Sequence, residues 1–209
     1  MKPIFAFSLF LLLFGKNHAQ TLTGTTHLPV SNWTWFFSVQ QQSDGSIYVG
    51  DDDGTLIKYA DAVWSTSKIA DAAGNRITAV RTLANGKIWA GTDDKGLFFF
   101  DGSTWINFST ANSTLPSDWV RDIEVAADGT VWVGTTAGLV KIGANNAFTV
   151  FKESNGLKGG AAYDLQFQGS TLWIGGSGFL LKMVGSNFTG FDITPHLNGF
   201  AQSAYQISV

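Results

Sequence analysis

A five-residue motif occurs four times along the chain at a nearly constant spacing. Each copy has an aromatic residue at its third position and glycine at its fifth, and the copies lie at residues 46–50, 87–91, 130–134 and 171–175. The four glycines are 41, 43 and 41 residues apart. A period of this length with one aromatic residue per copy matches four-stranded propeller blades, whereas helical-pair repeats have about 34 residues and leucine-rich repeats about 20 to 29.

Each copy also carries a second aromatic residue, 15 or 16 positions after the first, at Trp64, Trp105, Phe148 and Phe188. The third copy shows the expected strands clearly, at residues 120–126, 130–134, 138–142 and 147–151. Its first two strands are joined by Asp128-Gly129, which predicts a type I′ turn. Apolar residues occupy both faces of these strands, so we expect the repeated aromatic residues to pack between neighbouring sheets.

The pattern predicts an all-β propeller of four-stranded antiparallel blades. The expected blades span about 35–70, 76–110, 119–153 and 161–194, within a repeat region covering residues 20–209. Residues 205–209 repeat the pattern of 121–125 and 163–167, so residues 203–209 are expected to form the first strand of a fifth blade. We predict an open arc whose unpaired blade edges favour self-association. A four-bladed ring closed by residues 205–209 is the competing geometry.

The first residues have the three-part layout of a secretory signal. Lys2 precedes an apolar run over residues 4–14, and a short polar stretch leads to Ala19, after which we expect cleavage. The apolar run is shorter than the roughly 20 helical residues that span a bilayer, which argues against a lasting membrane anchor. The sequence therefore predicts a periplasmic or secreted protein, and its lack of cysteine excludes disulfides and thiol chemistry.

The charge balance argues against two classes of partner. Residues 20–209 contain 11 basic and 16 acidic side chains, which gives them a net charge of −5. This mildly acidic repeat region provides no electrostatic reason to expect nucleic acid or an anionic membrane as partner.

Residues 120–142, with their Asp-Gly turn, Trp-Val-Gly-Thr segment and Gly-Leu pair, resemble the two-component regulator propeller repeat. In that family, such repeats form the exported sensor regions of hybrid sensor kinases. The resemblance extends over residues 35–209 and implies a sensing or binding role. It says little about activity, because the repeat motif is the packing motif.

No catalytic motif is found in the sequence, and no cofactor is expected. His27 and His196, which remain after signal removal, lie in different copies, which disfavours a histidine metal cluster or a Ser-His-Asp relay. Asp51, Asp52 and Asp53 are weak metal-ligand candidates, but they lack the alternate spacing of a calcium loop. We interpret them as a solvated turn between two strands.

Ligands usually bind propellers at one end of the central channel, where loops of successive blades converge. Aromatic and arginine residues lie where the expected first strands begin, and together they suit sugars or peptides. Packing of these aromatic residues is the alternative interpretation. The candidate ligand-binding residues are Trp33, Trp35, Arg76, Trp119, Arg121, Tyr163 and Tyr205, with Phe37 and Thr78 between them in sequence.

Two functions follow from these observations. The first is an exported, non-enzymatic module that senses a ligand or interacts with a glycan, a peptide or a partner protein. The alternative is a propeller enzyme similar to the streptogramin lyases, which also have repeats with Asp-Gly and Trp. Because a lyase needs a positioned acid or base, His196 is the residue expected to supply it in that case.

Overall fold

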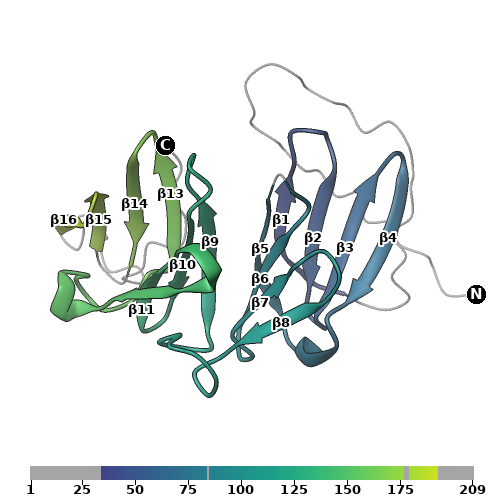
Figure 1. The fold of residues 1–209 in the computed structure, drawn as a ribbon, viewed down its shortest axis with the longest axis horizontal. Helices are drawn as coiled ribbons and strands as arrows, with labels where there is room; N and C mark the ends of the chain where they lie inside the picture. The colour runs from purple at the N-terminus through teal and green to yellow at the C-terminus, as the bar shows by residue number, and fades with distance from the viewer. Residues whose placement is uncertain (1–33, 84, 177–178, 193–209) are drawn as a thin grey trace, which may run out of the picture.

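The computed structural model describes residues 34–83, 85–176 and 179–192. These residues form four sheets, each made of four antiparallel strands that follow one another in the chain. We call the sheets blades 1 to 4 (Figure 1). The predicted all-β propeller architecture with four-stranded antiparallel blades is therefore confirmed. The expected first strand of a fifth blade, residues 203–209, lies outside the described residues.

The strand bounds are similar from one blade to the next. Blade 1 contains β1 (Phe36–Gln41), β2 (Ile47–Asp51), β3 (Thr55–Ala60) and β4 (Val63–Lys68). Blade 2 contains β5 (Ile77–Thr82), β6 (Ile88–Thr92), β7 (Leu97–Phe100) and β8 (Trp105–Phe108). Blade 3 contains β9 (Val120–Val125), β10 (Val131–Thr135), β11 (Gly138–Ile142) and β12 (Phe148–Phe151). Blade 4 contains β13 (Asp164–Gln168), β14 (Thr171–Gly175), β15 (Phe179–Val184) and β16 (Asn187–Asp192).

Three short 3-10 helices connect these strands: η1 (Ala70–Ala72), η2 (Ala144–Asn146) and η3 (Glu153–Asn155). Within the described part of the chain, none of the helices has the length and apolarity needed to cross a bilayer.

The turn between the first two strands differs from the predicted type I′ geometry. In blade 3, Gly129 has a positive φ of 83°, but Asp128 is not among the residues with positive φ. The Gly129 N–H donates to the Ala126 carbonyl at 2.9 Å, as in a type I turn followed by a left-handed glycine. The Asp128 carboxylate accepts the Thr130 N–H at 2.9 Å, so the aspartate stabilises the turn through its side chain. The prediction of type I′ was therefore wrong.

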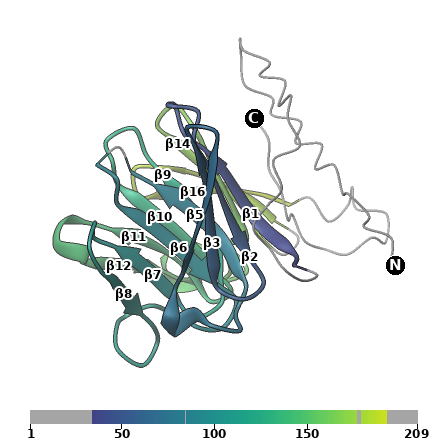
Figure 2. The same cartoon turned by 90° about the vertical axis from the view of Figure 1, so that its right-hand side faces the viewer.

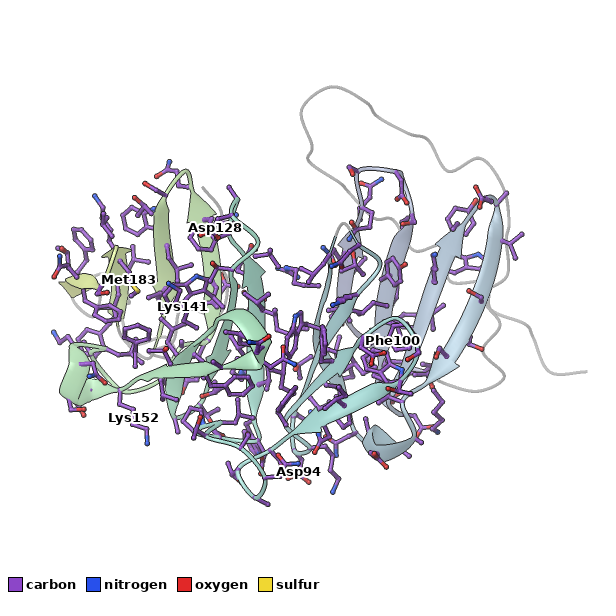
Figure 3. The ribbon with its side chains drawn as sticks, in the orientation of Figure 1. Asp94, Phe100, Asp128, Lys141, Lys152 and Met183 are labelled. Atoms are coloured by element: carbon purple, nitrogen blue, oxygen red, sulfur yellow. The ribbon has the colours of Figure 1, made fainter. Side chains whose placement is uncertain are left out.

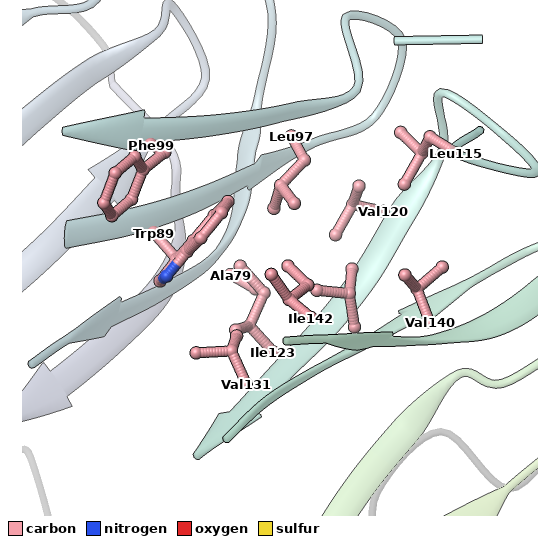
Figure 4. Close-up of a cluster of buried hydrophobic side chains, with 11 residues drawn as sticks. Ala79, Trp89, Leu97, Phe99, Leu115, Val120, Ile123, Val131, Val140 and Ile142 are labelled. Atoms are coloured by element: carbon pink, nitrogen blue, oxygen red, sulfur yellow. The ribbon is translucent and has the colours of Figure 1, made fainter. Parts of the chain in front are cut away.

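Side chains from neighbouring blades interdigitate to form the core. Trp89 of β6, which is 2% exposed, packs with Phe99 of blade 2 against Ile123 and Val131 of blade 3 (Figure 4). Trp132 of β10 packs in the same way against blade 4. The second series of aromatic residues faces the opposite way, and Phe148 of blade 3 packs back onto this cluster between blades 2 and 3. The two aromatic series thus fill each junction from both sides, as predicted.

The motif glycines allow consecutive blades to approach closely. A Cβ atom at Gly91 would lie 2.3 Å from Val120 Cγ1 of blade 3. A Cβ atom at Gly50 would lie 2.5 Å from Ile77 Cγ2 of blade 2. Ile77 and Val120 occupy the same position in their respective first strands. The first residue of the next blade's first strand therefore occupies the space that a side chain at the motif glycine would need. This explains why the motif ends in glycine.

The four blades form an arc around their first strands. β1, β5, β9 and β13 lie toward the middle of the molecule, and each packs beside the first strand of the next blade (Figure 1). Figure 2 looks onto blade 1 from the side. Among the described strands, β1 and β13 make no contact comparable to those between successive first strands. The described blades therefore form an open arc, and the strand proposed to close a ring, residues 205–209, lies outside them.

Candidate functional site

The first strands of blades 1 to 3 share a β-bulge at equivalent positions. In each strand, one residue is skipped between consecutive cross-strand pairs: Phe37 in β1, Thr78 in β5 and Arg121 in β9. Tyr163 takes the equivalent position just before β13, and its N–H donates to the Gly175 carbonyl at 2.7 Å. A bulge changes the direction in which its side chain points, so one residue in each of blades 1 to 3 is aimed differently from its neighbours.

These four side chains line one cavity of about 600 Å³ among the first strands. We call it the axial cavity. Its lining combines aromatic, hydroxyl and charged groups, and it also includes Ser38, Val39, Arg76, Ala79, Arg81, Asp93, Trp119, Asp122 and Asp164. The volume lies within the range of about 300–1,000 Å³ that is typical of small-molecule sites.

The structure brings four of the seven predicted ligand-binding residues together. Arg76, Trp119, Arg121 and Tyr163 all line the axial cavity. Trp35 is 71% exposed and is not part of the cavity lining, although it occupies the same repeat position as Trp119. The remaining two candidates, Trp33 and Tyr205, lie outside the described residues.

A second pocket of about 570 Å³ adjoins the first and shares Arg76, Asp93 and Trp119 with it. Its remaining residues come from loops at one end of the blades and include Asp52 and Asp94. Figure 3 shows Asp94 at the opposite end of the molecule from Asp128, whose turn joins β9 to β10. The axial cavity therefore continues into a mouth at the end formed by the loops between second and third strands.

Two arginines of the axial cavity are paired with carboxylates. Arg76 Nη1 lies 3.5 Å from Asp93 Oδ2, and its guanidinium lies 4.9 Å from the centre of the Phe37 ring in blade 1. Arg81 Nη2 of blade 2 lies 3.6 Å from Asp122 Oδ1 and 3.7 Å from Glu124 Oε1 of blade 3. These contacts join adjacent blades at the wall of the cavity.

Asp122 connects three blades. Its Oδ2 accepts the Leu165 N–H of blade 4 at 2.8 Å, while its Oδ1 faces Arg81 of blade 2 and accepts the Ile123 N–H at 2.8 Å. Burial raises the pKa of the Asp122 carboxyl to about 7, and the Arg81 charge and the Leu165 N–H only partly oppose this rise. Asp122 therefore changes charge near neutral pH at a contact shared by blades 2, 3 and 4.

Arg121 differs from the other two arginines of the cavity. Its guanidinium lies 5.5 Å from the centre of the Tyr163 ring, which belongs to the next blade. Within the described residues, no carboxylate forms an ion pair with it. Arg121 therefore brings a positive charge to the cavity wall that no ion pair with a described residue offsets.

Of the three consecutive acids, Asp52 and Asp53 lie in the predicted turn between β2 and β3, whereas Asp51 ends β2 and is buried, so the prediction of a solvated turn was wrong for Asp51. Asp51 Oδ1 accepts the N–H groups of Asp53 and Thr55 at 2.9 and 2.7 Å. Asp53 pairs with Lys68 and accepts the Gly74 N–H at 3.0 Å. Within residues 34–83, 85–176 and 179–192, no group of three His, Cys, Asp or Glu side chains could hold a metal ion.

Sequence reasoning missed several residues of the cavity wall, above all Arg81, Asp93 and Asp122. Asp122 and Asp164 are 42 residues apart and follow the equivalent cavity residues Arg121 and Tyr163, so the repeat spacing could have identified this pair. Arg81 and Asp93 carry no such signal. Arg81 meets its carboxylate partners only when blades 2 and 3 are aligned, and Asp93 meets Arg76 only when β5 and β6 are paired. His196, the residue expected to act in a lyase, lies outside the described part of the chain.

Comparison with protein families gives one match. The family model described as the two component regulator propeller matches residues 114–137, which include β9 and β10. No curated protein matches the chain. The chain therefore contains a two component regulator propeller repeat, in the blade where the sequence resemblance is clearest.

Solved structures share the arrangement of blades. The extracellular domain of a protein described as a hybrid two component system from B. thetaiotaomicron matches with a TM-score of 0.61 and 21% identity, over 74% of this chain and 23% of that one. Virginiamycin B lyase from Staphylococcus aureus matches with a TM-score of 0.60 and 11% identity, over 76% of this chain and 56% of the enzyme. The chain thus spans about a quarter of the first protein and just over half of the second. At these identities, the matches show a shared fold.

Proposed function

We propose that this chain is the ligand-recognising part of an exported two-component sensor, and that it binds its ligand in the axial cavity without chemical turnover. The observation that carries this proposal is the convergence of four side chains, one from the equivalent position of every described blade, on a single cavity. The two component regulator propeller repeat supports a sensor role. The extracellular domain with the same blade arrangement supports a location outside the cytoplasm.

The composition of the cavity wall favours a sugar as ligand. Trp119 and Phe37 are 52% and 42% exposed, which leaves aromatic surface open to the cavity and its mouth. Charged and hydroxyl side chains, including Asp93, Arg76 and Thr78, lie beside them. A sugar ring has an apolar face and an edge of hydroxyl groups, so it uses both kinds of contact.

The alternative function is that of a lyase. The similarity to virginiamycin B lyase is evidence for a shared fold only. The pKa of Asp122, about 7, would suit acid–base catalysis. However, both oxygens of its carboxylate are engaged, by the Leu165 N–H on one side and by Arg81 and the Ile123 N–H on the other. This arrangement favours a structural role that connects blades 2, 3 and 4.

Isothermal titration calorimetry of the full chain against a panel of oligosaccharides and peptides tests the proposal. We expect saturable heat with an oligosaccharide and a loss of affinity of at least about tenfold in Trp119→Ala, because exposed aromatic rings contribute strongly to binding. Phe191→Ala is the matched control, since Phe191 is also an exposed aromatic residue but lies on β16, outside both pocket linings. Equal affinity of wild type and Trp119→Ala would refute binding in the axial cavity.

A further inference from the structure

The charged groups of the axial cavity are unevenly paired. Arg76 lies 3.5 Å from Asp93, and Arg81 lies within 3.7 Å of both Asp122 and Glu124. The carboxylates therefore offset the charges of these two arginines. The third, Arg121, forms no ion pair with a described residue. A guanidinium is a permanent cation with five N–H donors, so Arg121, which has no ion-pair partner among the described residues, is available to a bound anion.

The local structure holds Arg121 ready to receive such an anion. It is the bulge residue of β9, which aims its side chain into the cavity. Its guanidinium lies 5.5 Å from the centre of the Tyr163 ring, which restricts its movement. A cation–π contact uses none of the hydrogen-bond donors of a guanidinium, so the N–H groups of Arg121 can still donate to a ligand. Two parallel N–H groups match the two oxygens of a carboxylate.

We infer that Arg121 binds the carboxylate of an acidic sugar, so that the axial cavity recognises oligosaccharides containing a uronic acid residue. This inference rests on the proposed function, because it assigns a ligand class to the same site. The exposed rings of Trp119 and Phe37 and the hydroxyl groups of Ser38 and Thr78 line the same cavity. The rings supply stacking surfaces for the rest of the sugar chain. The two hydroxyl groups donate to the Ile77 and Val120 carbonyls and can still accept hydrogen bonds from sugar hydroxyl groups.

Matched ligands and matched variants test the inference in the full chain. Calorimetry compares an oligogalacturonide with a neutral galacto-oligosaccharide of equal length, and a peptide of similar size with a free C-terminal carboxylate is the third ligand. The proteins are wild type, Arg121→Ala, Arg121→Lys and Lys152→Ala. Lys152 is an exposed cation that lines neither pocket, so Lys152→Ala controls for the loss of one positive charge. Thermal melts check that each variant is folded.

We expect wild type to prefer the acidic oligosaccharide. Arg121→Ala should weaken its binding about ten- to a hundredfold, as for the loss of a charge-assisted hydrogen bond, and should leave binding of the neutral one within about twofold. Arg121→Lys should retain part of the affinity, because lysine keeps the charge but not the two parallel donors. Lys152→Ala should bind like wild type.

Three results would overturn the inference, and they differ in what they say about the proposed function. If wild type binds the neutral and the acidic oligosaccharide with equal affinity, and Arg121→Ala changes neither affinity, the inference is refuted. The proposed glycan-sensing function would then still stand. Binding of the peptide alone would replace sugar by peptide as the ligand class. Absence of heat with all three ligands would count against the proposed function itself.

Discussion

Asp122 offers the sharpest test of how the blades are held together, because its carboxyl contacts three of them. In the folded protein, burial raises its pKa from the ordinary 3.8 to about 7. The folded state therefore binds this proton more tightly than the unfolded state does. The contribution of the protonated Asp122 carboxyl to the free energy of unfolding is fully present below about pH 4. It decreases as the pH rises and is lost once the pH has passed about 7. The substitution Asp122→Asn removes the titration but keeps a side-chain oxygen for the Leu165 N–H.

The size of the effect follows from the two pKa values. Each unit of difference corresponds to about 1.4 kcal/mol, so the whole shift is worth about 4 kcal/mol. Between about pH 5 and pH 8, wild type should lose about 2.5 kcal/mol of unfolding free energy through this group. Asp122→Asn should not show this loss, because an amide does not titrate. At about pH 8 the variant should therefore be more stable than wild type, although Arg81 has lost one of its two carboxylate partners.

Urea unfolding followed by tryptophan fluorescence at about pH 5, 6, 7 and 8 measures these free energies. Asp101→Asn is the control. Its carboxyl accepts hydrogen bonds from Thr104 and Ser103 that lower its pKa to about 2, so Asp101 stays ionised in both states over this range. This control should follow the pH dependence of wild type. Parallel curves for wild type and Asp122→Asn would show that Asp122 does not titrate near neutral pH, and the reasoning would fail.

Two further predictions concern the junctions between blades. Gly91→Ala should lower the unfolding free energy by about 1–3 kcal/mol in urea titrations, because the added methyl group would lie 2.3 Å from Val120 Cγ1. Gly143→Ala should have little effect, since its nearest neighbour would be the Ala147 oxygen at 3.6 Å, and equal losses in the two variants would contradict the close-approach role of Gly91. Trp89→Ala should cost about 3–5 kcal/mol and lower the melting temperature measured by circular dichroism, because Trp89 is almost fully buried between blades 2 and 3. A melting temperature within a degree or so of wild type would contradict this packing.

The fold was predictable because the packing itself repeats. An aromatic residue such as Trp89 and a glycine such as Gly91 recur at each junction for the same steric reason, so the period of the sequence reports the period of the structure. The type I′ prediction failed because Asp-Gly is compatible with several turns. The Asp128 side chain stabilises one of them by accepting the Thr130 N–H. An aspartate can accept the N–H two residues later in either kind of turn, so the dipeptide alone does not distinguish between them.

The site was only partly predictable. Arg121 and Tyr163 stood out because they lie where first strands begin, but the bulge that directs Arg121 into the cavity leaves no trace in residue type. Phe37, Thr78, Arg121 and Tyr163 are chemically unrelated, although they occupy equivalent positions. Asp122 meets Arg81 and Leu165 only after blades 2, 3 and 4 are aligned, so no local pattern could have shown its role.

The bulge position has an evolutionary consequence. The junctions depend on residues such as Gly91 and Trp89, whereas the residue at the equivalent cavity-lining position differs in chemistry from blade to blade. Mutations at this position can therefore alter what the cavity recognises while the scaffold stays intact. Because the four positions can change independently, many combinations of side chains can line the cavity. Duplication of a blade adds one more such position. A lineage built on this plan can acquire new specificities one substitution at a time.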